Sequence, residues 1–360
     1  MGVLSRSSKY DHVPFVTVLM PIRNEAGFIA RSLGAVLTQD YPADCMEILV
    51  IDGMSTDATR DIIRQTTAAR QEETARKLPA VLLLDNPGRI VPTGFNIGLQ
   101  HAHGEIIVRV DGHCEIAPDY VRRCVELLEE TGADNVGGLQ RAASDGVVGR
   151  AIALATSSPF GVGNAIFHYA EKPGWVDHLF LGAYRRQVFE RIGGFDEELV
   201  RNQDDEFDFR LVQAGGKIWL DPSIRVVYYN RPSLRKLWRQ YFQYGFYKVR
   251  VIQKRRAVPS WRHLVPGTFA ASLPASLLLT LLTRRPFWAL SIAGPYLVVN
   301  GLASLWVARK DWPTLPLLPA AYLVLHLSYG IGFLQGLWHW RRKPTQPAPF
   351  VVKPREGVMT

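Results

Sequence analysis

Three long apolar runs near the C-terminus constrain the fold of this chain more than any other feature. They cover residues 264–282, 287–307 and 315–338, between 19 and 24 residues each, and contain no Asp, Glu, Lys or Arg. An apolar helix of about 20 residues can cross the hydrocarbon core of a bilayer. Trp and Tyr lie near the ends of these runs and Arg and Lys clusters flank them, which favours a membrane over the alternative of a buried hairpin in a soluble domain. The sequence therefore predicts a membrane-associated C-terminal region.

The cations after the last run limit the number of crossings. Three full crossings would leave residues 341–343, Arg-Arg-Lys, on the outer side, against the positive-inside tendency. Pro266, Gly267 and Pro274 interrupt the first run, as in a re-entrant or interfacial segment. We therefore expect two crossings, with the C-terminus on the inner side.

Charge is divided unequally along the chain. The formal net charge is +9, yet only two acidic residues follow Asp221, against 20 Lys and Arg. Such a basic segment indicates an anionic partner, either nucleic acid or a membrane surface. The adjoining apolar runs favour the membrane, so we expect anionic membrane lipids and no nucleic acid as partners. Residues 233–256 mix aromatic residues with cations, as an interfacial helix facing anionic headgroups would.

Two features indicate a cytoplasmic location for the N-terminal part. The first 15 residues, MGVLSRSSKYDHVPF, contain no apolar segment, so we expect no secretory signal. The three cysteines, Cys45, Cys114 and Cys124, are odd in number and lack the spacing of a metal site. We interpret them as buried thiols rather than as a disulfide framework.

Apolar strand patterns alternate with helical patterns in the first part of the chain. Strand-like runs rich in β-branched residues cover residues 15–20, 46–52, 80–85 and 105–111. Apolar residues at helical spacing cover residues 25–37, 56–69 and 92–102. This alternation predicts an α/β fold with a mostly parallel sheet. Ligands of such sheets bind beyond the carboxyl ends of the strands.

Three aspartates stand at such strand ends: Asp52, Asp85 and Asp111. We expect them to face one crevice, where a cation or hydrogen-bond donors must offset their mutual repulsion. Asp85 is equally well explained by a cap or turn. Thr56 or Asp57 can cap the helix after Asp52, which leaves the Asp52 carboxylate free.

The sequence Asp111-Gly112-His113 follows the fourth strand. A tight turn there would present the carboxylate and the imidazole side by side. These two ligands suit a divalent metal site with open positions and are too few for a closed structural zinc site.

A second acidic cluster opens a predicted helix near residue 203. Its members are Asp204, Asp205, Glu206 and Asp208. Acidic residues in a first turn can simply complement the helix dipole. The following apolar and aromatic residues indicate instead that the segment packs inward, which makes the cluster a candidate general base opposite a metal.

Five motifs then resemble one known family. They are residues 21–29 (PIRNEAGFI), 50–59 (VIDGMSTDAT), 94–113 (GFNIGLQHAHGEIIVRVDGH), 180–199 (FLGAYRRQVFERIGGFDEEL) and 202–218 (NQDDEFDFRLVQAGGKI). In this order they resemble the inverting GT-A glycosyltransferases of family 2, which includes cellulose synthase and dolichol-phosphate mannosyltransferase, and most closely the ExoA-type enzymes of exopolysaccharide synthesis. The resemblance implies a Rossmann-like GT-A domain.

The resemblance also implies a role for individual residues. The donor nucleotide would contact Pro21, Asn24, Glu25, Asp52 and Asp111. Arg89, in the loop NPGRIVPTG, is a candidate contact of the diphosphate and is equally well explained as a surface cation. Asp111 and His113 would hold Mn²⁺ or Mg²⁺ against the donor diphosphate, with His113 in place of the family's second Asp, which favours Mn²⁺. Asp204 would be the base, with Asp205 as the alternative one residue away. Gly182, Gln203 and Arg210 would lie on the acceptor side.

The implied activity is transfer of a sugar from a UDP-sugar, glucose by resemblance, to a lipid-linked glycan on a polyprenyl diphosphate at the bacterial inner membrane. We expect a catalytic domain over residues 1–232, a basic interfacial region over 233–262, membrane helices over 263–342 and a polar tail over 343–360. The alternatives are a sugar-phosphate nucleotidyltransferase, although MPIRNEAGF is not the Gly-rich loop of that class, and a non-catalytic glycan-binding subunit, which Gly53, His113 and Gln203 make conceivable.

Overall fold

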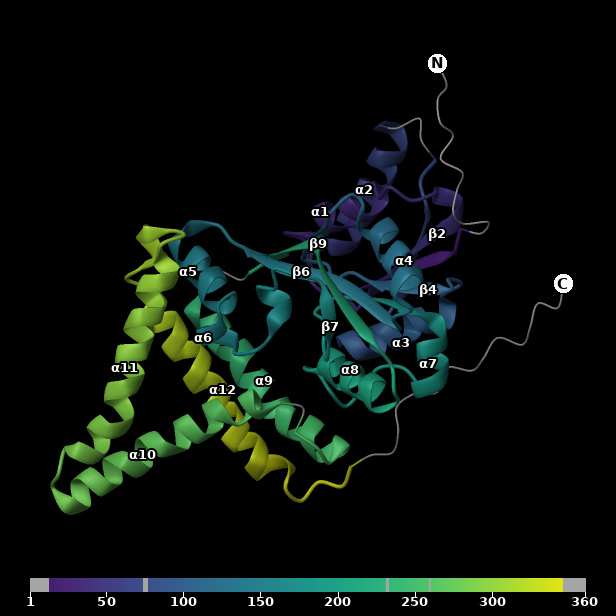
Figure 1. Cartoon of the computed structure of the whole chain (residues 1–360). Helices are drawn as coiled ribbons and strands as arrows, with labels where there is room; N and C mark the ends of the chain where they lie inside the picture. The colour runs from purple at the N-terminus through teal and green to yellow at the C-terminus, as the bar shows by residue number, and fades with distance from the viewer. Residues whose placement is uncertain (1–12, 74–76, 231–232, 259, 346–360) are drawn as a thin grey trace.

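A computed structural model describes residues 13–73, 77–230, 233–258 and 260–345. A nine-stranded mixed sheet with helices on both faces forms the N-terminal part, and four long helices follow it (Figure 1). The predicted α/β class is confirmed. The last 15 residues of the predicted polar tail lie outside the described residues.

The first half of the sheet is parallel, as predicted. Strands β1 (Val16–Ile22), β2 (Met46–Asp52), β3 (Ala80–Asp85) and β4 (Ile106–Arg109) pair in the order β3-β2-β1-β4. All seven residues of β1 are buried, because neighbouring strands flank it and helices cover both of its faces. The strand predicted over 105–111 ends at Arg109, so Asp111 lies in the turn beyond it.

The second half of the sheet contains antiparallel pairs. Its strands are β5 (Cys114–Ile116), β6 (Asn135–Ala143), β7 (Gly174–Val176), β8 (Ala183–Arg185) and β9 (Ile218–Tyr229). Strand β8 runs antiparallel to both β4 and β6, and β5 and β7 pair antiparallel with β9. The sheet thus continues β4-β8-β6-β9-β5, which brings β9 close to the turn after β4.

Helices cover the sheet in two layers. On one face, α1 (Ile29–Leu37), α2 (Thr59–Glu73) and α4 (Tyr120–Thr131) pack into one apolar core. On the other face, α3 (Val91–His101), α7 (Arg186–Ile192) and α8 (Gln203–Gln213) pack into a second core that is rich in Phe. The three predicted helices correspond to α1, α2 and α3.

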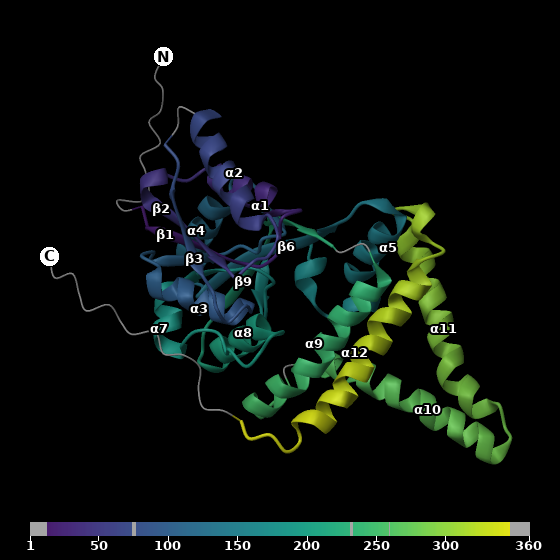
Figure 2. The same ribbon diagram turned by 180° about the vertical axis from the view of Figure 1, so that it is seen from behind.

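The C-terminal helices stand beside the sheet domain. They are α9 (Leu234–Arg255), α10 (Val265–Thr283), α11 (Phe287–Ala308) and α12 (Leu318–Trp340). Helix α12 lies along α9, whereas α10 and α11 form a hairpin that projects away from the sheet domain (Figures 1 and 2). The last three are long and apolar enough to cross a membrane, which agrees with the predicted membrane region.

Two short helices of the N-terminal part belong to this helical region instead. These are α5 (Gly146–Thr156) and α6 (Pro159–Val162), which lie within the predicted 1–232 domain. Ile152 and Ala155 of α5 share an apolar cluster with Tyr322 and Leu325 of α12. No pattern in the sequence predicts this packing, because α5 and α12 lie far apart along the chain.

The prediction that the cations of α9 face lipid headgroups is wrong for four of them. Lys248, Arg250, Lys254 and Arg255 form ion pairs with acidic side chains of the sheet domain. These acids had no partner assigned from sequence, because α9 and the acids lie far apart along the chain. The exposed cations of α9 are in its first half, at Arg235, Lys236 and Arg239.

Candidate active site

The turn between β4 and β5 presents Asp111 and His113 together, as predicted. Only glycine fits at Gly112, because a Cβ atom there would lie 2.8 Å from Ile22 Cγ2 and 2.9 Å from Glu25 Cγ. The backbone therefore packs closely against the end of β1. This close packing brings the side chain of Glu25 next to that of His113.

Glu25 orients the imidazole of His113. The two side chains meet with 3.0 Å between His113 Nδ1 and Glu25 Oε1. In the tautomer that this contact favours, Nδ1–H donates to the carboxylate and Nε2 keeps a free lone pair. Histidine ligands of metals are commonly held by a carboxylate in this way.

Three side chains of this turn are close enough to share a metal ion. The ligand atoms of Asp111, His113 and Cys114 lie within 4.8 Å of one another. Burial raises the pKa of the Cys114 thiol well above its ordinary value, and the charge of Asp111 adds to this rise. Thiolates select soft metals, whereas carboxylate and imidazole suit Mn²⁺ and Mg²⁺ better, so Asp111 and His113 are the better ligands for these ions.

Arg109, which is not among the predicted site residues, joins Asp111 to the acidic cluster of α8. Its guanidinium donates from Nε to Asp111 Oδ1 at 2.9 Å and from Nη2 to Asp111 Oδ2 at 3.1 Å. The third nitrogen, Nη1, donates to Asp204 Oδ2 at 3.3 Å. The Arg109 side chain is only 3% exposed, so one buried cation holds two carboxylates from different elements. The candidate metal ligand and the candidate base thus share one site.

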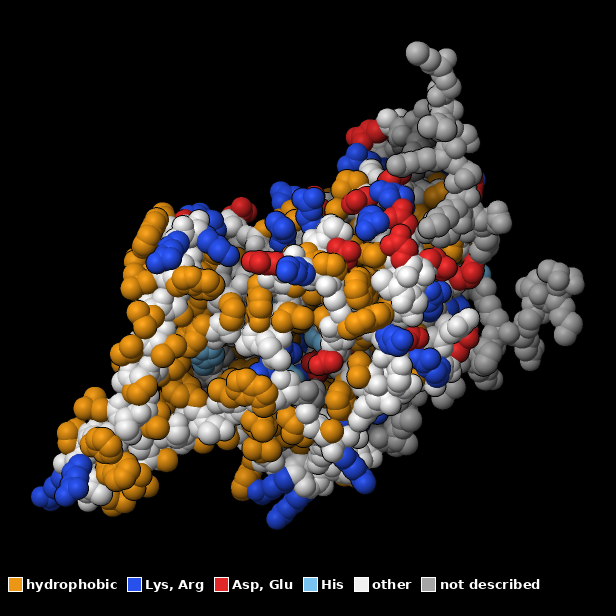
Figure 3. Space-filling view, viewed as in Figure 1, with side chains coloured by type: hydrophobic (Ala, Val, Ile, Leu, Met, Phe, Trp, Pro, Cys, Tyr) orange, Lys and Arg blue, Asp and Glu red, His pale blue; other side chains and the backbone are white. Residues whose placement is uncertain are grey.

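The four acids of the α8 cluster have four different partners. Arg109 pairs with Asp204, Lys248 with Asp205, Arg210 with Glu206 and His178 with Asp208. An inward-packed segment is therefore the correct interpretation, and the acids do more than complement the helix dipole. Figure 3 shows a hollow where the sheet domain meets the C-terminal helices, with acidic, basic and histidine side chains among apolar ones.

The partners separate Asp204 from Asp205 as candidate bases. Burial alone would raise the pKa of Asp205, but the ammonium of Lys248, 2.5 Å away, lowers it well below the usual range. A carboxylate held in this way is a weak proton acceptor. The Asp204 side chain is 19% exposed, its Oδ1 accepts from the Asp205 N–H at 2.9 Å, and its Oδ2 accepts from Arg109 at 3.3 Å. Among the described ion pairs no lysine holds it, so it is the more available of the two.

The expectation that Asp52 is free is wrong. Its Oδ1 accepts a hydrogen bond from the Ser55 hydroxyl at 2.5 Å, and Oδ2 accepts one from the Ser55 N–H at 3.1 Å. Arg60 lies between Asp52, at 3.6 Å, and Asp85, at 2.6 Å. Arginines thus offset the charges of the strand-end carboxylates: Arg60 lies between Asp52 and Asp85, and Arg109 lies between Asp111 and Asp204 of α8.

The residues predicted to contact the nucleotide surround the ends of β1 and β2. Asn24 adopts a left-handed backbone with φ of 53° and accepts a hydrogen bond from the Thr56 N–H at 2.9 Å. This bond ties the loop after β1 to the loop after β2. Pro21 is buried in β1, whereas Arg89 is exposed in the turn after β3. The structure brings these residues to one edge of the sheet, and their contact with a nucleotide stays a prediction.

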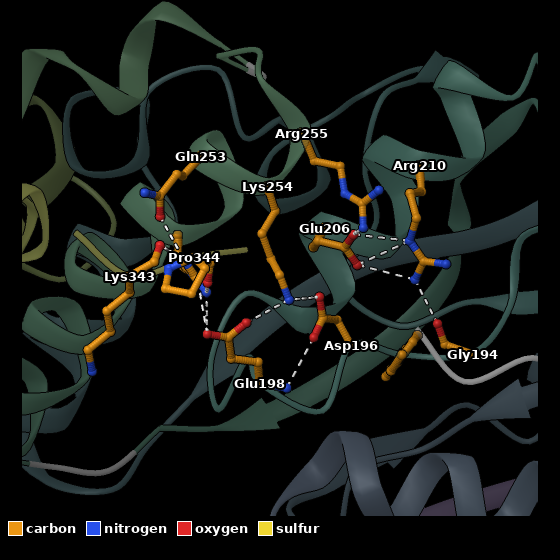
Figure 4. A network of polar contacts seen from close by, with 12 residues as sticks. Gly194, Asp196, Glu198, Glu206, Arg210, Gln253, Lys254, Arg255, Lys343 and Pro344 are labelled. Carbon is orange, nitrogen blue, oxygen red and sulfur yellow. Dashed lines mark hydrogen bonds and ion pairs between the residues drawn. The ribbon is translucent and has the colours of Figure 1, made fainter. Parts of the chain in front are cut away.

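The residues predicted on the acceptor side differ in their surroundings. Gly182 has no room for a side chain, because a Cβ atom would lie 2.1 Å from Asn135 Oδ1, and its carbonyl accepts from the Arg109 N–H at 3.0 Å. Gln203 is buried, and its Oε1 has no partner within the described part of the chain. Arg210 is buried, and its guanidinium donates hydrogen bonds to Glu206 and to the carbonyl of Gly194 (Figure 4). Their roles toward an acceptor stay predictions.

Arg109 could have been found from the sequence, and Lys248 could not. Successive residues of a strand point to opposite faces, so Arg109 and Asp111 fall on the same side. A cation two residues before a strand-end carboxylate therefore predicts an ion pair between the two side chains. Lys248 lies 43 residues from Asp205, and nothing in its local sequence separates it from the other cations of α9.

Comparisons with known proteins identify the family of this chain. The sequence profile described as "Glycosyl transferase family 2" matches residues 17–193. The succinoglycan biosynthesis protein ExoA of Rhizobium meliloti strain 1021 is 30% identical over 333 residues, which cover 91% of this chain and 96% of that protein. A dolichyl N-acetyl-alpha-D-glucosaminyl phosphate 3-beta-D-2,3-diacetamido-2,3-dideoxy-beta-D-glucuronosyltransferase of Methanococcus voltae is 27% identical over 90% of this chain and 97% of that protein.

One solved structure has a similar fold. A mannosyltransferase of Pyrobaculum calidifontis, in complex with GDP-Man and Mn²⁺, superposes with a TM-score of 0.58 at 21% identity, over 91% of this chain and 88% of that one. The fold and the site together define a glycosyltransferase of the GT-A class. The chain belongs to glycosyl transferase family 2, as its motifs suggested.

Proposed function

We propose that this chain is a metal-dependent, inverting glycosyltransferase that moves a sugar from a UDP-sugar to a lipid-linked glycan at a membrane. Arg109 carries the proposal, because it brings the metal turn at Asp111 and the base Asp204 into one site beside the apolar helices. The name of the ExoA relative supports exopolysaccharide synthesis, and that of the Methanococcus relative supports a polyprenyl acceptor. Membership of family 2 sets aside a sugar-phosphate nucleotidyltransferase.

The residues divide the reaction between two sides. A divalent ion held by Asp111 and His113 would neutralise negative charge on the leaving diphosphate. On the acceptor side, Asp204 accepts the proton of the attacking hydroxyl. Arg109 keeps both carboxylates in place, and a single displacement inverts the anomeric carbon. The hydroxyl attacks from the face opposite the leaving diphosphate.

In this proposal the three predicted segments of the chain keep the roles expected from the sequence. Residues 1–232 carry catalysis on the cytoplasmic side of a bacterial inner membrane, and residues 263–342 hold the enzyme at the bilayer. Residues 233–262 join the two, with the second half of α9 bound to the sheet domain. Anionic lipids remain the proposed partners of Arg235, Lys236 and Arg239, which are exposed on the first half of α9.

Purified full-length protein in lipid nanodiscs tests the activity. With labelled UDP-glucose and membrane lipid extract, we expect transfer to a lipid product, loss of transfer on chelation, and recovery with Mn²⁺ or Mg²⁺. A screen of other UDP-sugars identifies the donor. A protein that binds lipid-linked glycan but neither transfers nor hydrolyses any donor would be the non-catalytic subunit instead.

Changing the metal ligand tests the assignment of His113. His113→Asp alone would place a second carboxylate beside Glu25, so the variant to compare is Glu25→Gln with His113→Asp. We expect the double variant to keep metal binding and to shift its preference from Mn²⁺ towards Mg²⁺, since carboxylate is the harder ligand. Titration of Mn²⁺ and Mg²⁺ by calorimetry reads the shift directly. An unchanged ratio of the two affinities would remove His113 from the metal site.

A further inference from the structure

Helix α9 is attached to the sheet domain at both ends. It begins at Leu234, shortly after β9 ends at Tyr229. At its other end, Lys254 Nζ lies 2.5 Å from Asp196 and 2.7 Å from Glu198 (Figure 4). Although it has 22 residues, α9 therefore starts and finishes on the same side of any membrane that the protein meets.

The start of α12 is held by α5 and α6. Arg150 of α5 forms an ion pair at 2.6 Å with Asp311, in the connection before α12. One turn into α12, the Tyr322 and Ser158 hydroxyls are 2.9 Å apart. Because α5 follows directly from β6 of the sheet domain, the start of α12 is held on the catalytic side.

The end of α12 is held by the last turns of α9. Gln253 Nε2 donates to the Trp340 carbonyl at 3.0 Å, and Arg250 donates to the Pro344 carbonyl at 2.7 Å. Arg250 also pairs with Glu198 at 2.7 Å. The end of α12 is thus joined through one buried arginine to the sheet domain.

Between its ends, α12 packs closely along α9. A Cβ atom at Gly332 would lie 2.1 Å from the Phe242 carbonyl, and one at Gly336 would lie 2.7 Å from the Phe246 carbonyl. Glycines at this spacing let two helix backbones approach. A helix fixed to α9 along its length cannot cross a bilayer while α9 remains on one side.

We infer that α12 lies at the membrane surface beside α9, and that only the α10–α11 hairpin enters the bilayer. This inference rests on the membrane association proposed above. It differs from the crossings expected from the sequence, which were the runs 287–307 and 315–338. It also places the C-terminus on the catalytic side, so the cations at 341–343 obey the positive-inside tendency without a third crossing.

The exposed surface of the hairpin fits lipid hydrocarbon. Only 17% of the apolar window of α10 and of α11 is buried, against 44% for α12. Leu290, Leu297 and Leu302 of α11 are each more than 60% exposed. With 19 and 22 residues, α10 and α11 are about 28 and 33 Å long, close to the thickness of a hydrocarbon core. The hairpin tip carries Arg284 and Arg285, which this topology places on the side opposite the catalytic domain, so the positive-inside tendency is met at 341–343 and not at the tip.

Cysteine labelling of the full chain in right-side-out and inverted membrane vesicles tests the inference. Lys310→Cys and Arg342→Cys lie before and after α12, and both positions are exposed. A Cys45→Ser background removes the partly exposed native thiol, since Cys114 and Cys124 are buried. Arg239→Cys on α9 marks the catalytic side. We expect all three to react with a membrane-impermeant maleimide only in inverted vesicles.

Labelling of positions 310 and 342 from opposite sides would overturn the inference, because α12 would then cross. A protease-sensitive tag after residue 360 gives a second measurement that needs no internal substitution. Leu297→Cys and Leu302→Cys test the hairpin, and we expect them to react only after detergent is added. Reaction without detergent would show that the hairpin does not enter the bilayer. None of these measurements needs transfer activity, so a failed glycosyltransferase assay and a failed topology remain distinguishable.

Discussion

Asp204→Asn is expected to lower the rate of sugar transfer by about 10²- to 10⁴-fold, the usual effect of removing a positioned general base. Asn keeps the shape of the side chain but cannot accept the hydroxyl proton. UDP-sugar affinity should change little, because Asp204 contacts Arg109 and α8 rather than the predicted nucleotide residues. Single-turnover transfer to a lipid-linked acceptor measures the rate, and calorimetry with UDP measures the binding.

Asp205→Asn provides the control, and the structure predicts a different defect for it. This change leaves the ammonium of Lys248, which is only 4% exposed, without its partner. Breaking a buried ion pair from one side typically costs about 3 to 5 kcal/mol of folding free energy. We therefore expect a lower melting temperature and near-parent transfer per folded molecule, and Asp205→Asn with Lys248→Gln should recover stability. If Asp205→Asn abolishes transfer while Asp204→Asn does not, then Asp205 is the base and the assignment to Asp204 is wrong.

The sequence predicted the half of the fold that depends on local patterns. The strands β1 to β3 were found from short runs of β-branched residues, and α1 to α3 from helical spacing between them. The turn after β4 was found because a carboxylate and an imidazole follow a buried strand. In each case the signal lies within one element or its flanking residues.

The antiparallel half of the fold, and the site that Asp111 and Asp204 share, could not be predicted from local sequence patterns. Strand β8 is only three residues long, and it pairs with β4 and β6 from distant parts of the chain. The cations of α9 look like a lipid-facing surface in sequence, yet Lys248, Lys254 and Arg255 bind acids of the sheet domain. A charge pattern indicates that an anionic partner exists, but does not indicate whether that partner is a lipid or the same chain.

The membrane region shows the same limit of sequence patterns. Hydropathy makes α10, α11 and α12 equivalent, because each is long and apolar. What distinguishes α12 is its attachment, through Arg150 to Asp311 at one end and through Arg250 at the other. Length and composition describe what a helix can cross, whereas its contacts decide which side its ends occupy.

Asp111→Asn tests whether the strand-end carboxylate binds a metal or only anchors Arg109. As a ligand, Asp111 supplies the charge that a divalent ion needs, so we expect Mn²⁺ affinity to fall by about 100-fold, which corresponds to about 2.7 kcal/mol. Metal-dependent UDP binding and transfer should fall with it. If Asp111 only anchors Arg109, the change should lower stability and leave metal affinity unchanged. Asp111 accepts one hydrogen bond from Arg109 on each carboxylate oxygen, and an amide has only one oxygen to accept them. Calorimetric Mn²⁺ titration, with the melting temperature measured alongside, separates the two roles.

Asp85→Asn is the matched control for this test. Asp85 also ends a parallel strand of the same sheet, but its side chain is 59% exposed and pairs with Arg60 rather than Arg109. We expect this variant to bind Mn²⁺ and UDP as the parent does. Asp111→Asn with a lowered melting temperature and unchanged Mn²⁺ affinity would assign Asp111 to Arg109 alone, because a ligand cannot be removed without weakening the metal. An equal loss of affinity in both variants would instead indicate a general effect of charge at this edge of the sheet, since Asp85 contacts neither His113 nor Asp204 among the described ion pairs.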